Sequence, residues 1–520
     1  MHIHLFKDKL NSKFNKYIDK KYPMWFILLK TILITLGEYK FLKRWNTPPK
    51  DNKLNICLYM QGGVGDIIVY NIYLKELIKK LDTDVTIDVY PTLNNSISKS
   101  LFKNYPVAIK NYELYKQGKI SYYDIILDFK RLTVLKYANY RRLKEKSKFL
   151  YNYCKSLESF QANYPFIYSN PWDTIPISKD LGLALGKTRE TLPDISGELG
   201  LSNETTSYLA LNPKAFEILD KYNLKDKTFI TIHRGLDGNV IAPNCVRLWP
   251  LSYYNELIKQ IKQKYPDLTI VQLGISEDRC EKFDNIDINL IGKTSFEEVL
   301  AILKYSSFHI DYEGGFVHLR HQMNKTSCVL FGQTTIDFVG YPENINLKSN
   351  ACPVACENLR RDWAYSCLRG FENAPCMTEL KPDYVFKNIT SFLDSVINKP
   401  EKNVEKQEVE RIKQYFNENN PLNKKIVFYG KEFYEIAKKI ATNNQITIYD
   451  SVLDNTTINE AKDLGIFMEY GDLYNIPEGD AVCDYVVLKK LNHFENTNFI
   501  ERDFKRILKH QGKLIMEGKL

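Results

Sequence analysis

A glycine-rich turn early in the chain carries an acidic side chain. Residues 61–66 read Gln-Gly-Gly-Val-Gly-Asp and follow an apolar run with the composition of a buried strand. Gly63 and Gly65 allow backbone amides to approach a ligand at the start of the next helix, where Asp66 stands. Because a carboxylate repels phosphate, we expect Asp66 to act as a general base or to contact a sugar hydroxyl; the alternative is a simple helix cap.

A second set of turns, much later in the chain, combines positive charge with glycine. His233-Arg234-Gly235 follow a predicted strand, Arg247 precedes Leu-Trp-Pro at a helix start, and Glu313-Gly314-Gly315 with His318 occupy a strand-to-helix turn. Turns that follow parallel strands meet at one edge of a sheet, where cations and free amides suit a nucleoside diphosphate. Each residue alone could be structural, and their order and spacing carry the prediction.

Four cysteines lie close together in the sequence. Cys352, Cys356, Cys367 and Cys376 fall within 25 residues. Four thiolates in so short a segment suit tetrahedral coordination of structural zinc or iron, although the spacing is not the commonest zinc pattern. Disulfides and unlinked thiols remain the alternatives. Because no export signal is recognisable, we expect a reducing, cytoplasmic compartment.

Two successive α/β series must position these side chains. The first predicts a domain over residues 54–215 and the second a domain over residues 226–396, with a cleft between them. The predicted strands are 54–60, 84–90 and 123–129 in the first series and 228–233, 268–273, 308–312 and 327–331 in the second, with helices over 252–265 and 295–305.

A third, shorter α/β pattern follows a polar segment. Residues 397–423 are charged and polar, which is typical of a linker or a solvated helix. Residues 424–520 then predict a small α/β domain, with strands over 425–429, 445–450, 481–488 and 513–516.

Composition and charge exclude several classes of protein. With 44% hydrophobic and 26% charged residues in 520, the chain is neither disordered nor fibrous. Residues 1–50 hold eleven Lys and Arg against three acids, so this arm carries +8 of the +9 net charge. A general nucleic-acid binder would place its excess charge on the folded body, so we expect no nucleic-acid partner.

The basic arm also contains an apolar run, residues 25–36. It is shorter than the ~20 apolar residues that span a bilayer. The arm therefore predicts either a helix docked on the protein's own core or peripheral contact with an anionic inner-membrane surface.

Several motifs together resemble the heptosyltransferase family of GT-B glycosyltransferases. The resemblance covers roughly residues 54–390. The motifs that carry it are Gly62-Gly63-Val64-Gly65-Asp66, Arg247-Leu248-Trp249-Pro250, Leu290-Ile291-Gly292-Lys293-Thr294-Ser295-Phe296-Glu297-Glu298-Val299, Glu313-Gly314-Gly315-Phe316-Val317-His318-Leu319 and Val329-Leu330-Phe331-Gly332-Gln333-Thr334.

The resemblance implies two Rossmann-like domains in the GT-B arrangement and an inverting, metal-independent sugar transfer. The donor would be ADP-heptose or a similar nucleoside diphosphate sugar, and the acceptor a lipooligosaccharide or a protein. By position, Asp66 would be the catalytic base and Arg247 the cation at the donor phosphates. The donor-binding residues would be Gly63, Gly65, His233, Arg234, Gly274, Glu277, Glu313, Gly314, Gly315 and His318. The family's usual Asp-Ser-Gly or Asp-Thr-Gly is Glu313-Gly314-Gly315 here, which leaves the sugar and the base open.

The C-terminal segment resembles a degenerate class I methyltransferase. Its first turn, Tyr429-Gly430-Lys431-Glu432-Phe433, has one glycine where that family has several, so we expect no catalysis there. The alternatives to a sugar transferase are a binding or scaffold protein that has lost turnover, and a bifunctional glycosyltransferase and methyltransferase.

Overall fold

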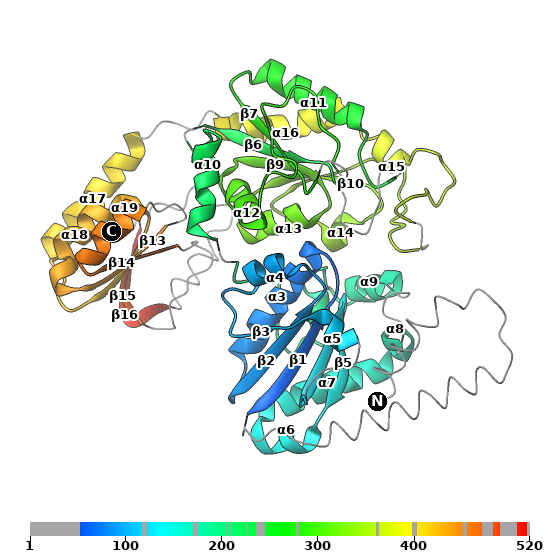
Figure 1. Cartoon of the computed structure of the whole chain (residues 1–520), viewed down its shortest axis with the longest axis horizontal. Coiled ribbons are helices and arrows are strands. Elements are labelled where there is room, and N and C mark those ends of the chain that lie inside the picture. The colour runs from blue at the N-terminus through cyan, green and yellow to red at the C-terminus, as the bar shows by residue number, and fades with distance from the viewer. Residues whose placement is uncertain are drawn as a thin grey trace. The chain divides into compact units, whose positions relative to one another are not determined.

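The computed structural model is α/β throughout, as the sequence predicts (Figure 1). It describes residues 53–516, apart from 117–121, 170–174, 204, 210, 226, 236–244, 277–279, 360–362, 398–402, 451–454, 471–481 and 489–506. The chain divides into two compact units. The first comprises residues 1–208, 334–339 and 355–363, and the second comprises 209–333, 340–354 and 364–520. Each is described by itself, and the GT-B arrangement stays a prediction.

The first unit is built on a five-stranded sheet with the order β3-β2-β1-β4-β5. Its strands are β1 (Leu54–Met60), β2 (Val85–Pro91), β3 (Ala108–Ile109), β4 (Ile125–Lys130) and β5 (Leu132–Ala138). The predicted strands at 54–60, 84–90 and 123–129 are confirmed within two residues. Strands β1 to β4 run parallel, whereas β5 folds back antiparallel to β4 through a tight turn at Arg131, an addition that the sequence prediction lacked.

Helix α3 (Val64–Lys79) starts directly after β1 and is buried over most of its length. In its first three turns, apolar side chains occupy several sides of the helix: Ile67, Ile68, Val69 and Ile72 are all buried. A helix with apolar residues on several sides packs inside the protein rather than on its surface. This burial fixes the position of the turn before it. The other helices of this unit are α4 (Asn95–Leu101), α5 (Tyr112–Lys116), α6 (Tyr140–Lys146), α7 (Lys148–Asn163), α8 (Pro165–Ser169), α9 (Ile175–Ala184), α14 (Ile336–Val339) and a 3-10 helix at Leu192–Asp194.

The second unit contains an all-parallel six-stranded sheet with the order β11-β10-β9-β6-β7-β8. Its strands are β6 (Phe229–His233), β7 (Thr269–Leu273), β8 (Ile288–Asn289), β9 (Phe308–Tyr312), β10 (Ser327–Phe331) and β11 (Ile345–Lys348). All four predicted strands are present. The short β8 and β11 lie at the two edges, where the sequence offers too few apolar residues to stand out.

Two predicted helices of this unit are confirmed. Helix α11 (Leu251–Lys264) packs with α16 (Pro382–Ile397) in one hydrophobic core against the sheet. Helix α12 (Phe296–Tyr305) begins at a capping box, in which Ser295 and Glu298 satisfy each other's backbone amides. The remaining helices are α10 (Glu217–Lys221), α13 (Gly315–Gln322), α15 (Pro375–Thr378) and a 3-10 helix at Pro213–Phe216.

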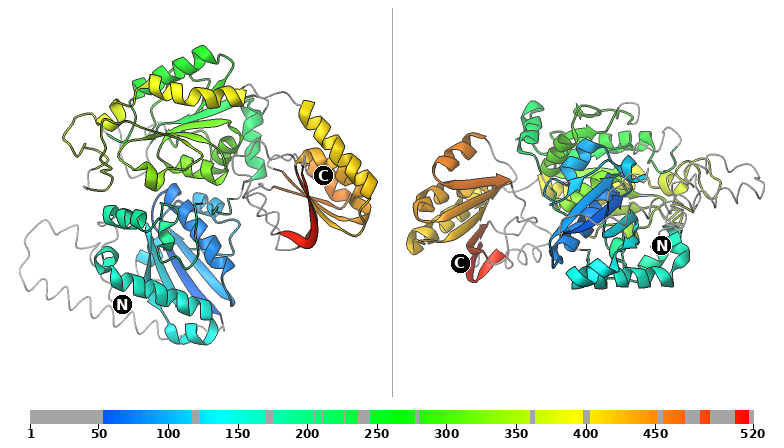
Figure 2. Two further views of the ribbon diagram at one scale, coloured as in Figure 1. Left: turned by 180° about the vertical axis from the view of Figure 1, so that it is seen from behind. Right: turned by 60° about the horizontal axis from the view of Figure 1, so that its bottom comes forward.

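A third sheet, within the second unit, has the order β14-β13-β12-β15-β16. It is coloured from yellow-orange to red in Figure 2. Its parallel strands are β12 (Lys425–Tyr429), β13 (Gln445–Asp450), β14 (Ile466–Tyr470), β15 (Cys483–Leu488) and β16 (Leu508–Met516), and its helices are α17 (Asn403–Asn419), α18 (Tyr434–Ile440) and α19 (Asn455–Asp463), with 3-10 turns at Lys431–Phe433 and Ala441–Asn443.

The segment predicted as a linker or solvated helix forms α17. Its Ile412 and Phe416 are 1% and 2% exposed and share a core with the third sheet. This part of the segment is therefore a structural helix of the C-terminal domain. Ile412 and Phe416 are four residues apart and therefore lie on one face of the helix. The sequence analysis missed this pattern because most residues around them are charged or polar.

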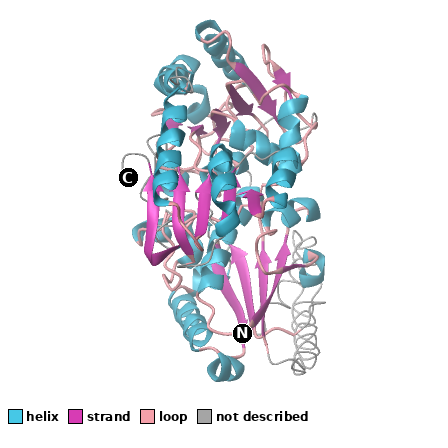
Figure 3. Cartoon of the chain, turned by 90° about the vertical axis from the view of Figure 1, so that its left-hand side faces the viewer, coloured by secondary structure: helices cyan, strands magenta, loops and turns pink. Residues whose placement is uncertain are grey.

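Helices flank each of the three sheets (Figure 3). In the part of the chain that the structure describes, no helix is long and apolar enough to cross a membrane. The basic arm, residues 1–50, lies outside the described residues, and so does the prediction of membrane contact that rests on it.

Candidate active site

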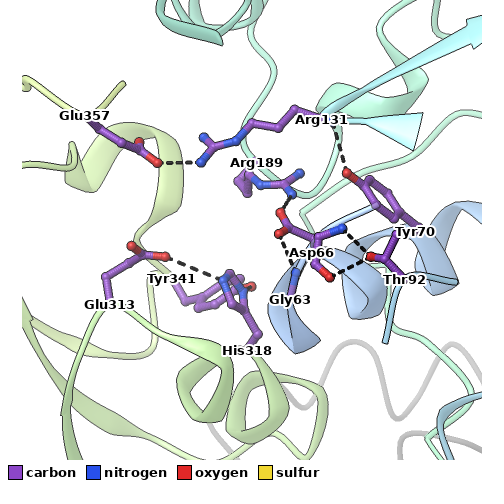
Figure 4. Close-up of polar contacts among 11 residues, drawn as sticks. Gly63, Asp66, Tyr70, Thr92, Arg131, Arg189, Glu313, His318, Tyr341 and Glu357 are labelled. Carbon is purple, nitrogen blue, oxygen red and sulfur yellow. Dashed lines mark hydrogen bonds and ion pairs between the residues drawn. The ribbon is translucent and has the colours of Figure 1, made fainter. Parts of the chain in front are cut away.

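Asp66 sits in the first turn of α3, at the carboxyl edge of the first sheet (Figure 4). Its Oδ2 accepts a hydrogen bond of 3.0 Å from the backbone N–H of Gly63. Its Oδ1 pairs with the guanidinium of Arg189. The side chain keeps 31% of its surface exposed, so it caps the helix and still faces solvent.

The glycine turn is shaped to admit this carboxylate. Gly62 has φ +135°, a conformation that favours glycine, and a Cβ added there would lie 2.3 Å from Oδ2 of Asp66. Thr92, directly after β2, holds the same turn: its Oγ1 accepts from the N–H of Gly62 at 3.0 Å. By contrast, no atom lies within 4 Å of a Cβ added to Gly63, so the space beside Gly63 is open.

Two arginines of the first unit surround Asp66, and the sequence analysis named neither. Arg189 is 4% exposed, and its backbone N–H donates to the carbonyl of Phe338 at 2.8 Å. Arg131 forms the turn between β4 and β5 with φ +65°, and its guanidinium pairs with Glu357. Arg131 follows a strand, so the rule applied to His233 and Arg234 could have found it. Arg189 lies in a loop with no motif, and no sequence signal marks it.

These charges set the ionisation of Asp66. Burial raises the pKa of the Asp66 carboxyl, but the positive charges of Arg189 and Arg131, together with hydrogen bonds from Arg189 and Gly63, outweigh that effect. The resulting pKa lies below the ordinary value, so Asp66 is a carboxylate at neutral pH. A carboxylate in this position can orient a hydroxyl group and accept its proton.

In the second unit, Glu313 lies between two of the predicted donor-binding side chains, Arg247 and His318. Its carboxylate is 3.6 Å from the Nη2 of Arg247 and 3.7 Å from the Nε2 of His318. Arg247 also lies over the ring of Tyr312, 5.6 Å from its centroid. The structure therefore brings these three predicted residues together, with Glu313 next to both Arg247 and His318.

His318 is oriented from its other ring nitrogen. Its Nδ1 lies 2.5 Å from the hydroxyl of Tyr341, a residue that the sequence analysis did not consider (Figure 4). His318 belongs to α13, which starts at Gly315 with Gly314 as its N-cap. Gly314 has an extended backbone, and a Cβ there would make only ordinary contacts, so its glycine is not required by the chain itself.

The predicted residues after β6 and β7 are partly engaged within the protein. Nδ1 of His233 lies 3.0 Å from Asp311, and Nε of Arg234 donates to the carbonyl of Trp249 at 2.9 Å. Arg234 also pairs with Glu281. Gly274 is tightly packed, since a Cβ there would lie 2.7 Å from the sulfur of Cys280. Glu277 lies outside the described residues.

The structure does not support the predicted zinc or iron site. Among the described residues, no group of three or more His, Cys, Asp or Glu side chains could hold a metal ion. Three of the four cysteines pack instead among apolar side chains of the second unit's core: Cys352, Cys367 and Cys376. Cys356 is also buried, and none of the four is in a disulfide. Close spacing along the sequence did not predict convergence of the thiols.

Residues 121–361 match the family model of glycosyltransferase family 9 (heptosyltransferase). The chain is a glycosyltransferase. The match covers slightly less than half of the chain; it includes Arg189, Arg247, Glu313 and His318, whereas Asp66 precedes it. No curated protein gives a significant match.

Solved structures give more distant similarities. A family 9 glycosyl transferase from Veillonella parvula is 13% identical, covering 67% of this chain and 99% of its own, with a TM-score of 0.43. The E. coli ADP-heptose lipopolysaccharide heptosyltransferase II is 12% identical, covering 65% and 98%, with a TM-score of 0.41. A protein described as a putative S-adenosylmethionine-dependent methyltransferase, from Methanococcus maripaludis, is 24% identical over 21% of this chain and 52% of its own, with a TM-score of 0.17. All three TM-scores are below 0.5, so the family match carries the assignment.

Proposed function

We propose that this glycosyltransferase moves a heptose or a related sugar, with inversion, from a nucleoside diphosphate to a hydroxyl group of a lipooligosaccharide or a protein. One observation carries the proposal: Asp66 is an ionised, partly exposed carboxylate at a glycine turn on the carboxyl edge of the first sheet. Ligands of open α/β sheets bind at that edge. The match to a heptosyltransferase family model supports the sugar class.

In the proposed reaction, Asp66 acts on the acceptor. Its carboxylate accepts the hydroxyl proton while the acceptor oxygen forms a bond to the anomeric carbon of the sugar. The bond from that carbon to the diphosphate oxygen breaks, and the electron pair leaves with the diphosphate. Arg189 keeps Asp66 deprotonated and fixes one of its oxygens, at the cost of weakening it as a base.

The donor side neutralises the departing diphosphate. Arg247 supplies a permanent positive charge, and His318 supplies a ring N–H oriented by Tyr341. Glu313 pairs with both groups, so a bound diphosphate has to compete with this carboxylate. We therefore expect Glu313 to turn toward the hydroxyl groups of the ribose or sugar when the diphosphate binds.

The pairing of Glu313 with Arg247 and His318 also favours a second candidate function. A carboxylate that permanently neutralised Arg247 and stayed beside His318 would leave a protein that binds nucleotide sugars weakly, or a scaffold without turnover. Glu313 replaces the shorter aspartate that the heptosyltransferase family commonly has, and its extra methylene lets it reach both side chains.

Purified protein incubated with a panel of nucleotide sugars separates the two functions. The panel includes ADP-heptose, and the readout is release of nucleoside diphosphate with and without deacylated lipooligosaccharide or an unfolded acceptor protein. Acceptor-dependent release supports the transferase. Saturable binding without release from any donor would contradict it and support the scaffold.

A further inference from the structure

Three side chains at the carboxyl edge of the six-stranded sheet form a chain of contacts. His233 ends β6, Asp311 belongs to β9, and Cys280 follows β7. Nδ1 of His233 lies 3.0 Å and 3.1 Å from the two carboxylate oxygens of Asp311. Nε2 of the same imidazole and Sγ of Cys280 lie beside one another, because both border the point where a Cβ on Gly235 would stand. A thiol, an imidazole and a carboxylate in this order form an arrangement that activates cysteine as a nucleophile.

The space beside Gly235 and Gly274 shows that Nε2 is the His233 ring atom next to the sulfur of Cys280. A Cβ added to Gly235 would lie 2.5 Å from Sγ of Cys280 and 2.6 Å from Nε2 of His233, so these two atoms border the same point. Gly235 and Cys280 are also joined by a short antiparallel bridge. On the other flank, a Cβ at Gly274 would lie 2.7 Å from the same sulfur. Both positions need glycine because the thiol occupies the space of a side chain.

The carboxylate holds the ring in its charged form. Burial lowers the pKa of His233, but the charge of Asp311 and its hydrogen bond outweigh burial and raise that pKa to about 10. Asp311 is itself fixed, because it accepts the backbone N–H of Tyr312 at 2.8 Å and lies 3.4 Å from the Nε2 of His309. His233 is therefore an imidazolium at neutral pH, with one N–H directed at the thiol.

Cys280 responds differently from other buried cysteines of the chain. Burial raises the pKa of its thiol, but the hydrogen bond and the charge of His233 outweigh burial, and its pKa falls below the ordinary value. Burial instead raises the pKa of Cys245 and of Cys328. His233 and Arg234 interact electrostatically with the thiol, and Glu281, the residue after Cys280, pairs with Arg234.

We propose that Cys280, beside the His233–Asp311 pair, is a nucleophilic cysteine and the site at which small uncharged electrophiles, hydrogen peroxide among them, modify this chain. The thiolate attacks one peroxide oxygen, a sulfur–oxygen bond forms, and the oxygen–oxygen bond breaks. Sulfur is oxidised to sulfenic acid and the peroxide is reduced to hydroxide, which takes the His233 proton and leaves as water. Since Cys280 is only 3% exposed, the reagent has to be small.

Modification has a consequence for the donor side that rests on the proposed function. The sulfur is packed between Gly235 and Gly274, so an added oxygen has no room and displaces the ring of His233. His233 and Gly274 are proposed donor-binding residues. Oxidation of Cys280 therefore weakens nucleotide binding, which makes the donor domain sensitive to peroxide.

The test measures oxidation of Cys280 directly and so does not depend on transferase activity. Folded full-length protein is treated briefly with hydrogen peroxide across a pH series and then denatured, and the sulfenic acid that has formed is labelled with dimedone. Peptide mass spectrometry follows the labelling of Cys280, with Cys245 and Cys328 as internal references. We expect Cys280 to react at least ten times faster than either reference at pH 7, with a midpoint about one pH unit or more below the ~8.5 of an ordinary thiol.

His233→Gln and Asp311→Asn are the matched variants, and either one that folds suffices. Each should move the Cys280 midpoint upward by about one pH unit or more, because the imidazolium is lost or loses its counter-ion. Peroxide treatment of the wild type should yield sulfenic acid at Cys280 and lower its ADP affinity, while Cys280→Ser should keep its affinity under peroxide. Labelling of Cys280 no faster than that of Cys245 or Cys328, or a midpoint unmoved in the folded variants, would overturn the proposal.

Discussion

Asp66 is a helix cap whose carboxylate is also charged, so the cap and the proposed general base are compatible in one side chain. It caps α3 through Gly63 and is also a charged group whose pKa is lowered by arginines. A helix cap needs only one carboxylate oxygen, which leaves the second for Arg189. The motif predicted the acid and its place, whereas the counter-charge comes from a residue 123 positions away that only folding brings near.

The pH dependence of transfer tests the role of Arg189. Since the pKa of Asp66 is depressed, the base stays ionised well below neutral pH and is lost only as the pH falls through that lowered value. In Arg189→Gln the pKa rises, so the acidic limb of the kcat/KM profile should move to higher pH. Arg189→Lys keeps the charge and serves as the control. A profile identical in wild type and folded Arg189→Gln would show that Arg189 does not set the ionisation of the base.

Arg247 offers a second test at the scale of one residue. Arg247→Ala should weaken ADP binding by ~1.5–3 kcal/mol, the range for a charge-assisted hydrogen bond. Calorimetric titration measures it. The matched control is Arg369→Ala, an exposed arginine over the ring of Phe371 in the same unit, which should leave the affinity unchanged. Equal ADP affinity in Arg247→Ala and wild type would place Arg247 outside the donor site.

At the scale of elements, the turn between β1 and α3 depends on one glycine far more than on its neighbour. Gly62→Ala would add a Cβ against Asp66 in a backbone conformation with φ +135°, whereas Gly63→Ala would meet no atom within 4 Å. We expect Gly62→Ala to lower the free energy of unfolding by ~1–3 kcal/mol and Gly63→Ala by much less. Denaturant unfolding of the two variants measures the difference, and equal stabilities would mean that the turn is not strained.

The sequence analysis predicted the buried strands more accurately than the short or edge strands. The mostly apolar strands β6 and β10 were predicted within one residue of their ends, because a strand buried on both faces is rich in apolar side chains. The two-residue β8 and the hairpin strand β5 were missed. β8 is too short to show an apolar pattern, and β5 is a strand because it pairs with β4 across a tight turn, which the local sequence does not show. The metal site predicted from the spacing of Cys352, Cys356, Cys367 and Cys376 is not supported among the described residues, because three of these side chains are part of the apolar core of the second unit.

At the scale of the whole molecule, the third sheet repeats the α/β pattern but lacks an open glycine turn. The carboxylate of Glu432 folds over Gly430, 2.3 Å from where a Cβ would stand. A nucleotide-like cofactor approaches the sheet at this turn, so it would have to displace the Glu432 carboxylate and would find one glycine where several are usual.

Full-length protein should therefore bind no S-adenosylmethionine. Calorimetric titration at micromolar concentrations, with ADP as the positive control for the same preparation, should detect heat for ADP alone. Saturable binding of S-adenosylmethionine would instead identify the C-terminal domain as a working cofactor site and the chain as bifunctional.

The most direct test of the account is the transfer rate of Asp66→Asn, measured with the donor and acceptor that support turnover of the wild type. Asparagine keeps the size of the side chain and can still accept the Gly63 N–H, but it cannot take a proton. We predict that kcat falls by ~10²–10⁴, while ADP affinity and the free energy of unfolding stay close to those of the wild type. A folded Asp66→Asn that retains more than half of the wild-type rate would show that Asp66 only caps α3, and the proposed mechanism would be wrong.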